Sequence, residues 1–134
     1  MRVADLMQTE VQTVPPDAVV TDAVLALAEY RVSALPVVDR QGHLVGVFSR
    51  TDILASEEEA ENQSARATLF NSTRVRDLMT VLPLTIAPGA EIRDAARQML
   101  DASVHRLFVQ QGERLVGVIS TTDIMRAVAE ERLR

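Results

Sequence analysis

The sequence repeats itself at a nearly constant spacing, and this repeat constrains the fold more than any other feature. The five residues Val-Ala-Asp-Leu-Met at positions 3–7 return as Val-Arg-Asp-Leu-Met at positions 75–79, which is 72 residues later. The ten residues at 44–53 return at 115–124, a spacing of 71, and eight of the ten aligned pairs are identical. Because self-similarity at a fixed spacing is the signature of a duplicated structural unit, we expect both halves of the chain to share one fold.

Each repeat has the pattern of an α+β unit with the element order β-α-β-β-α. Apolar residues at helical spacing predict a helix, and two mostly apolar runs joined by the Gln41-Gly42 turn predict a hairpin. In the first repeat we expect a short turn at 3–7, an extended piece at 12–14, a helix at 21–31 capped by Thr21, strands at 35–39 and 44–48, and a helix after Ser49. In the second repeat we expect an extended piece at 84–86, a helix at 92–101, strands at 106–110 and 115–119, and a closing helix at about 121–132.

The spacing divides the chain into two repeats at 1–60 and 74–134, with a linker at 61–73. The glutamate-rich run at 57–61 is expected to be a solvated extension of the preceding helix. The linker is polar except for Leu69 and Phe70, which we expect to pack on a neighbouring surface. Because a unit of about 60 residues buries only a small apolar area, we expect the two repeats to form one module.

Composition excludes several classes of protein and of site. The chain has no cysteine and two histidines, which excludes disulfides and thiolate chemistry and indicates no transition-metal cluster. All 14 basic residues are arginine, so lysine Schiff-base chemistry and a P-loop lysine are also excluded. No candidate nucleophile has a base placed near it by the sequence, so we expect neither enzyme activity nor a catalytic cofactor.

Charge and hydropathy limit the partners. The formal net charge of −5 argues against broad nucleic-acid binding through a basic surface. No apolar run approaches the length of about 18 residues that a membrane-spanning helix needs. The first residues lack the apolar stretch of a signal peptide, so we expect a cytoplasmic protein without membrane contact.

The strongest local signal is Ser-x-Thr-Asp, which occurs where the second strand of each repeat runs into a helix. The motif comprises Ser49, Arg50, Thr51 and Asp52 in the first repeat and Ser120, Thr121, Thr122 and Asp123 in the second. One interpretation is structural: the serine caps the helix and the aspartate bonds back to it, as we also expect of Asp5 and Asp77 at the short opening turns. The other is a nucleotide contact, because free N–H groups at a helix start suit a phosphate and a carboxylate can accept both ribose hydroxyls. The two interpretations are compatible.

A second signal is His105-Arg106, which opens a strand of the second repeat. Arginine offers a fork of donors that matches phosphate, so this pair is a candidate anion contact. The alternative is an ordinary pair at a surface edge. The first repeat has Ser33-Ala34 at the matching positions, so the cationic pair is present in one repeat only.

Taken together, these motifs resemble the tandem CBS (cystathionine β-synthase-type) repeat of a Bateman module. The resemblance rests on four features: the opening Val-x-Asp-Leu-Met, the Thr-hydrophobic-x-Pro of each first strand, Leu-Pro-Val-Val-Asp at 35–39, and the closing Gly-Val-hydrophobic-Ser-x-Thr-Asp-Ile. It implies an α+β fold in which two repeats pack through their sheets with pseudo-two-fold symmetry. It also implies two clefts between the repeats, where relatives bind AMP, ADP, ATP, S-adenosylmethionine or cyclic dinucleotides.

The resemblance also assigns roles to single residues. Asp52 and Asp123 match the ribose-binding aspartate, and the hydroxyls of the same motif match the groups beside ribose and phosphate. His105-Arg106 is similar to the phosphate-contacting pair of energy-sensing relatives such as the regulatory subunit of AMP-activated protein kinase. The remaining implied nucleotide-binding residues line the base pocket and are Thr13, Val14, Ala34, Leu35, Pro36, Thr85, Ile86 and Leu107. Because only one repeat has the cationic pair, we expect the two sites to be unequal.

Two functions follow from these observations. The first is a non-catalytic sensor that binds an adenosine-containing ligand and signals to an effector protein. The second is a structural dimerisation module whose clefts are empty. In either case the resemblance implies a homodimer, for which the apolar residues around Ile53-Leu54 and Ile124-Met125-Val128 are candidate contacts, although these faces could equally be core.

Overall fold

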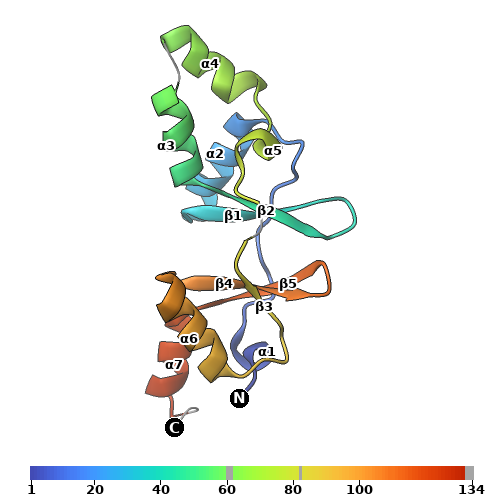
Figure 1. Ribbon diagram of the computed structural model, residues 1–134, viewed down its shortest axis with the longest axis vertical. Coiled ribbons are helices and arrows are strands. Elements are labelled where there is room, and N and C mark those ends of the chain that lie inside the picture. The colour runs from blue at the N-terminus through green and yellow to red at the C-terminus, as the bar shows by residue number, and fades with distance from the viewer. Residues whose placement is uncertain (60–61, 82, 132–134) are drawn as a thin grey trace. The chain divides into compact units, whose positions relative to one another are not determined.

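The computed structural model describes residues 1–59, 62–81 and 83–131, and it gives the helical backbone without the side chains of residue 59 and residues 66–70. It consists of helices and short strands (Figure 1). They are α1 (Val3–Leu6), α2 (Val20–Tyr30), β1 (Ala34–Val38), β2 (Leu44–Ser49), α3 (Arg50–Glu59), α4 (Gln63–Ser72), α5 (Val75–Leu78), β3 (Thr85–Ile86), α6 (Ile92–Ala102), β4 (Arg106–Gln111), β5 (Arg114–Ser120) and α7 (Thr121–Ala129).

The chain folds into two compact units that do not coincide with the two sequence repeats. The first-repeat unit comprises Gln12–Pro83, and the second-repeat unit comprises Met1–Val11 together with Leu84–Arg134. The opening segment of each repeat is therefore exchanged: α1 folds with the second repeat, and α5 folds with the first. The spatial units therefore differ from the sequence repeats at 1–60 and 74–134 by the exchange of these opening segments.

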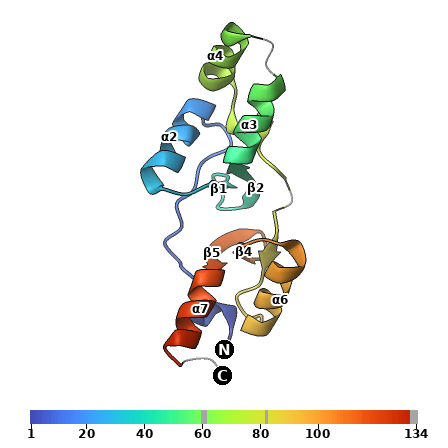
Figure 2. The same cartoon turned by 90° about the vertical axis from the view of Figure 1, so that its left-hand side faces the viewer.

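The first-repeat unit is built on the antiparallel hairpin β1–β2, whose register places Ala34 opposite Ser49. Figures 1 and 2 show α2 and α3 on one face of this hairpin. The apolar stripe of α2 meets the strands in one buried cluster, and the exchanged α5 adds a fully buried valine to it. The buried members of this cluster are Val14, Val20, Ala23, Leu27, Leu35, Val37, Phe48 and Val75.

The second-repeat unit has a three-stranded sheet in the order β3-β4-β5, in which β3 is parallel to β4 and β4 is antiparallel to β5. Helices α6 and α7 cover one face of this sheet (Figure 2). The exchanged α1 contributes Val3 and Leu6 to the core. The other buried members of this core are Ile92, Ala95, Met99, Leu107, Val109, Ile119 and Ala127.

Each exchanged segment is fixed to its unit by the residue that follows the short helix. Gln8 exchanges two backbone hydrogen bonds with Val118, at 2.8 and 2.9 Å, and Thr80 exchanges two with Val47, both at 2.9 Å. The crossing passes directly over a glycine in each case. A Cβ at Gly117 would lie 2.7 Å from the carbonyl oxygen of Gln8, and one at Gly46 would lie 2.9 Å from that of Thr80. The glycine of the repeated Leu-Val-Gly-Val motif is thus required by close backbone approach.

The α+β class, the two hairpins and the order of helices predicted from the repeat are confirmed. The expected caps at the opening turns are also present, since the backbone N–H groups of Arg2 and Arg74 donate to the carboxylates of Asp5 and Asp77 at 2.8 and 3.2 Å. The first expected strand of the first repeat is reduced to a single parallel bridge between Val14 and Val37.

Three local predictions differ from the structure. Thr21 does not cap α2: the helix begins at Val20, whose N–H donates to the carbonyl of Thr73 at 2.9 Å, so a tertiary acceptor replaces the side-chain cap. Within the linker, α4 forms with Asn62 as its N-cap, accepting from the N–H of Ala65 at 2.8 Å. The closing helix α7 ends at Ala129, short of the expected residue 132. The expected packing of Leu69 and Phe70 lies outside the described side chains.

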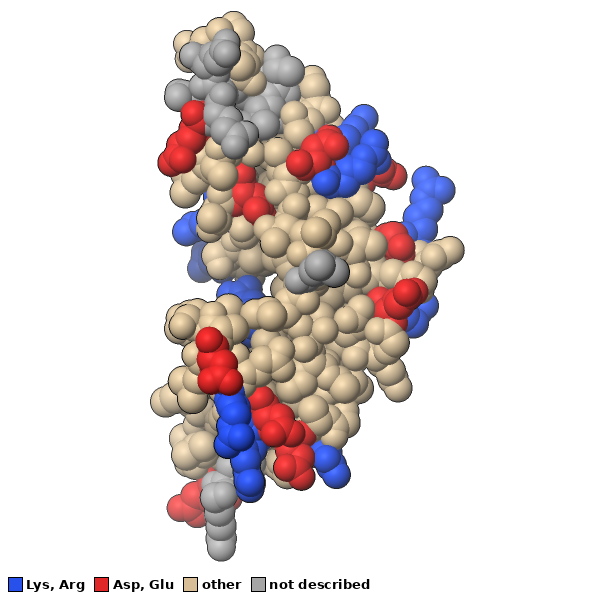
Figure 3. All heavy atoms as spheres, viewed as in Figure 1, with Lys and Arg blue, Asp and Glu red and all other residues tan. Residues whose placement is uncertain are grey.

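The charged side chains show no large patch of one sign on the face drawn in Figure 3, where acidic and basic groups are interspersed in both units. This pattern agrees with the modest net charge of −5. Among the described residues, no helix is both long and apolar enough to cross a membrane.

Candidate functional site

The junction between β2 and α3 holds the Ser-x-Thr-Asp motif of the first-repeat unit. The Oδ2 atom of Asp52 accepts from the backbone N–H of Ser49 at 2.8 Å and from the Ser49 hydroxyl at 3.0 Å. The Oδ1 atom accepts from the hydroxyl of Thr80, in the exchanged segment, at 3.0 Å. The carboxylate therefore connects the strand end, the helix start and the crossing segment within one unit.

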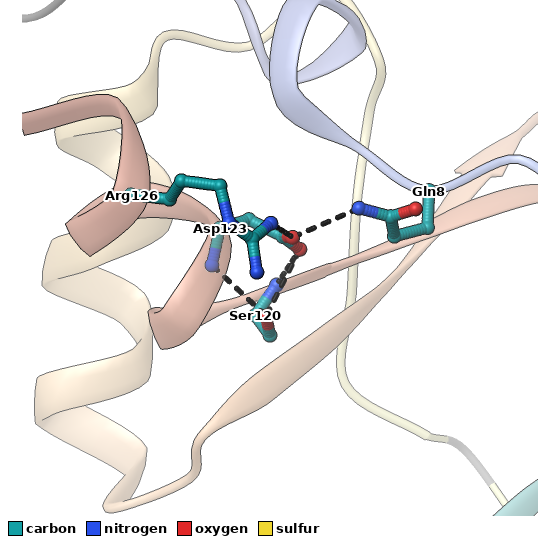
Figure 4. A network of polar contacts seen from close by, with 4 residues as sticks. All are labelled: Gln8, Ser120, Asp123 and Arg126. Carbon is teal, nitrogen blue, oxygen red and sulfur yellow. Dashed lines mark hydrogen bonds and ion pairs between the residues drawn. The ribbon is translucent and has the colours of Figure 1, made fainter. Parts of the chain in front are cut away.

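The junction between β5 and α7 has the same framework with different partners (Figure 4). The Oδ2 atom of Asp123 accepts from the backbone N–H and the hydroxyl of Ser120, both at 2.9 Å. The Oδ1 atom accepts from the Nε2 amide of Gln8 at 3.0 Å and lies 3.6 Å from the Nη1 atom of Arg126. Asp123 is only 5% exposed, and no other charged residue in the described part of the chain is buried.

The capping interpretation of the motif is confirmed. Ser120 accepts from the N–H of Asp123 at 3.1 Å while the carboxylate bonds back to Ser120, which forms a complete capping box. The pair Ser49 and Asp52 makes the same reciprocal bonds, with the return bond at 3.4 Å. A carboxylate at the first turn also interacts favourably with the helix dipole. The caps hold both aspartates in fixed positions at the ends of buried strands.

The other predicted residues of the first repeat gather around this junction. The N–H of Val14 donates to the carbonyl of Pro36 at 3.1 Å, which places the 13–14 segment beside β1. Ala34 lies opposite Ser49, and the N–H of Arg50 donates to the carbonyl of Ser33 at 3.0 Å. The start of β1 and the start of α3 are therefore joined by backbone bonds at one edge of the hairpin.

The second-repeat unit repeats this arrangement. Thr85 and Ile86 pair with Phe108 and Val109 of β4, so the first strand runs beside the strand that contains Arg106 and Leu107. Arg106 lies opposite Ser120 in the ladder. The N–H of Thr121 donates to the carbonyl of His105 at 2.9 Å. The backbone thus brings the anion-contact candidates next to the helix start of the same unit.

Burial separates the predicted residues into two groups. Val14, Leu35, Pro36, Leu107 and Asp123 are buried, and three of the four apolar ones belong to the core clusters, so these apolar side chains are part of the packed fold. The remaining predicted residues are partly or fully exposed and can offer side-chain contacts; they are Thr13, Ala34, Ser49, Arg50, Thr51, Asp52, Thr85, Ile86, His105, Arg106, Ser120, Thr121 and Thr122.

An apolar cavity of about 550 Å³ opens beside the second junction. Helices α6 and α7 line it with Met99, Leu100, Ile124 and Met125, and the predicted site residues His105 and Thr121 lie at the same cavity. The sequence singled out Ile124 and Met125 but not Leu100, which is 80% exposed. No group of described residues has the composition of a metal site.

Sequence reasoning missed Gln8, Thr80 and Arg126, which are the partners of the two carboxylates. Gln8 and Thr80 occupy equivalent positions, each directly after the repeated Leu-Met pair. That shared position was the available signal. It gave no reason to connect either residue with a distant aspartate, because the connection arises from the exchange of the opening segments between repeats.

Comparison with known protein families identifies the family of this chain. The CBS domain model matches residues 3–59 and 75–130, which include both junctions. The chain belongs to the CBS-domain family. The resemblance drawn from the repeated motifs is therefore confirmed.

Among CBS-domain relatives, the chloroplastic protein CBSX2 of Arabidopsis thaliana is 30% identical over 96% of this chain and 63% of its own length. This chain thus spans less than two thirds of that relative. YhcV of Bacillus subtilis is 29% identical over 91% of this chain and 81% of its own length. The solved structure of CBSX2 in complex with AMP superposes with a TM-score of 0.82, at 32% identity and 98% coverage of both chains.

Proposed function

We propose that this CBS-domain chain is a non-catalytic regulatory module that binds an adenosine-containing ligand at the Ser-x-Thr-Asp junctions. An adenine nucleotide (AMP, ADP or ATP) is the first candidate and S-adenosylmethionine the second. Ligand binding would shift the conformational equilibrium that an effector protein reads, by no more than the ligand's difference in affinity for the two states. The observation that carries this proposal is the fixed carboxylate at the start of α3 and of α7.

Three features support an adenosine ligand. Each carboxylate lies at a helix start, where backbone N–H groups and the helix dipole favour an anionic phosphate. The exposed guanidinium of Arg50 and the partly buried Arg106 are donors at the same edges of their units. The similar CBSX2 has been solved with AMP. Each unit would thus bring together the groups that contact the ribose hydroxyls, the phosphate and the base of such a ligand.

Calorimetric titration of the full chain with AMP, ADP, ATP and S-adenosylmethionine tests the proposal. We expect saturable binding of at least one ligand and its loss in the double variant D52N/D123N, which keeps the shape of both side chains but removes both charges. D101N changes an exposed carboxylate on α6 and serves as the matched control. Absence of heat for all four ligands would refute the function.

A dimerisation module remains the second candidate, because the exposed apolar side chains on α6 and α7 favour it. Leu100, Met125 and Val128 are 80%, 70% and 56% exposed, and burying them would be favourable. We propose that a second copy of the chain covers this face. Sedimentation should show a dimer that L100E/M125E converts to a monomer, whereas a monomer in the unaltered protein would contradict the assembly. Dimerisation without any ligand binding would favour this candidate over the sensor.

A further inference from the structure

The two junctions have the same cap but differ in what holds the second oxygen of the aspartate. At Asp52 this oxygen accepts from the hydroxyl of Thr80 at 3.0 Å. At Asp123 it accepts from the Gln8 amide at 3.0 Å and faces the guanidinium of Arg126 at 3.6 Å. The position equivalent to Arg126 in the first repeat is Ala55, so no cation stands there.

We propose that Gln8 and Arg126 close the second-repeat junction to ribose, so that a nucleoside binds preferentially at Asp52. This inference rests on the proposed function, because it takes the two aspartates as the ribose-binding groups. Figure 4 shows the closing contacts, with the Gln8 amide and the Arg126 guanidinium both directed at the Asp123 carboxylate.

The capacity of each carboxylate to accept hydrogen bonds supports this assignment. An ionised carboxylate offers about four acceptor positions over its two oxygens. Ser120 takes two positions on Oδ2 of Asp123, and Gln8 with Arg126 directs donors at Oδ1. A ribose needs acceptor positions for two hydroxyls, so it must displace both side chains.

At Asp52 the same count leaves one acceptor position on Oδ1. Ser49 takes two positions on Oδ2, and Thr80 takes one on Oδ1. The Thr80 hydroxyl can also rotate and accept a hydrogen bond from an incoming ribose, whereas the nitrogen atoms of Gln8 and Arg126 can only donate. A ribose at Asp52 can therefore donate one hydroxyl to the remaining Oδ1 position and the other to the Thr80 hydroxyl, without replacing the existing contacts.

Access to solvent differs in the same direction. Asp123 is 5% exposed and Asp52 is partly buried. Gln8 is itself exposed and the Arg126 side chain is 52% exposed, so both can turn into solvent when the carboxylate is taken by a ligand. The closure is thus reversible, and its strength corresponds to one charge-assisted hydrogen bond and one exposed ion pair. Losing these contacts costs about tenfold in affinity.

Adenosine and AMP are the probes for this inference. Adenosine has no phosphate, so its binding reports contacts to ribose and base, and comparison with AMP reveals any phosphate contact of Arg126. In the unaltered protein we expect the titration to show one tight binding phase, with one ligand per chain. D52N should lower the affinity of this phase at least tenfold. We expect Q8A/R126A to tighten a second, weaker phase by about tenfold, and D123N added to that variant should remove the gain. R93A removes an exposed arginine on α6 and is the matched control.

A reciprocal exchange tests the same residues without relying on a loss of stability. T80Q/A55R installs the closing pair at the first junction, where both positions are exposed. We expect adenosine to bind this variant about tenfold more weakly at Asp52. Unchanged affinity in both Q8A/R126A and T80Q/A55R, or a tight phase that is insensitive to D52N, would overturn the inference while leaving nucleotide binding intact. Absence of binding in every variant would instead refute the proposed function.

Discussion

The two units have the same buried framework but differ in the side chains that contact the aspartate at the start of α3 or α7. Both keep the glycine under the crossing segment, the serine cap and the left-handed residue after the first long helix, Arg31 in one unit and Ser103 in the other. They differ in the residue that reaches the carboxylate from the exchanged segment, Thr80 against Gln8. Duplication thus preserved the positions that backbone geometry requires, whereas the partners of the carboxylate diverged.

The crossing glycines should give the largest effect and test whether the two frameworks are equally tight. A Cβ at Gly117 would lie 2.7 Å from a backbone oxygen, whereas at Gly46 the 2.7 Å contact is with the flexible Met79 side chain and the backbone oxygen is at 2.9 Å. Because a backbone atom cannot move aside cheaply, we expect G117A to lower the free energy of unfolding by about 2–3 kcal/mol and G46A by about 1–2 kcal/mol.

Urea unfolding followed by circular dichroism measures both glycine variants. The matched control is G89A, because a Cβ at Gly89 would meet nothing within 4 Å. We expect that variant to be neutral or more stable by up to about 1 kcal/mol, through lower entropy of the unfolded chain. Equal stability of G117A and G89A would show that the exchanged segment is not held against β5.

The serine caps come next in size and test whether burial makes the second cap more important. Ser120 supplies two hydrogen bonds to Asp123, a carboxylate that is 5% exposed, so its hydroxyl is difficult to replace with water. We expect S120A to cost about 1–2 kcal/mol and S49A, beside the more accessible Asp52, about 1 kcal/mol. Thermal unfolding compares them, with S72A on the exposed end of α4 as the control. A larger cost for S49A would reverse the comparison.

Much of the framework could be predicted from the sequence because the repeat marks it twice. The hairpins, the helix order and the capping role of Asp123 all follow from local patterns that recur at a fixed spacing. The exchange of α1 and α5 could not be predicted in this way. A four-residue helix with one or two buried residues packs equally well, by pattern, against either copy of the same fold, and only tertiary contacts decide between them.

The errors in local structure have the same origin in tertiary contacts. The start of α2 depends on the Thr73 carbonyl, which lies more than 50 residues away in sequence and replaces the cap expected of Thr21. Helix α4 has a weak apolar pattern, and its capping signal at Asn62 was the only local indication that it would form. At the site, both aspartates were predicted, whereas Gln8 and Thr80 were not because the crossing segments bring them there.

The left-handed residues that end α2 and α6 should give a smaller effect and should not distinguish the units. Arg31 and Ser103 have φ values of 54° and 56°, a conformation that glycine adopts without the steric cost of a Cβ. We expect R31G and S103G each to raise the free energy of unfolding by about 0.5–1 kcal/mol. Urea unfolding measures the increments, and a clear difference between them would show that side-chain contacts of Arg31 or Ser103 also contribute.

The smallest effect concerns the hairpin turns, where Asp39 of the first unit has no titratable equivalent in the second unit. Asp39 accepts from the backbone N–H groups of His43 and Gln41, both at 2.9 Å, and these bonds hold the pKa of its carboxyl below the ordinary value of about 4. The equivalent residue in the second unit is Gln111, which does not titrate. A lowered pKa in the folded state means that the stabilisation is present above the unfolded value and is lost as the pH falls through the folded value.

We therefore expect the first hairpin to loosen more than the second below about pH 4, because Gln111 replaces Asp39 in the second hairpin. Nuclear magnetic resonance titration of the Asp39 carboxyl should give a midpoint below that of an unstructured aspartate, and amide exchange should report the opening of each turn. D39N removes the titrating group but keeps an acceptor, so its hairpin should lose the pH dependence. Equal loosening of both hairpins in acid would show that the general charge of the chain, and not the Asp39 turn, governs the response.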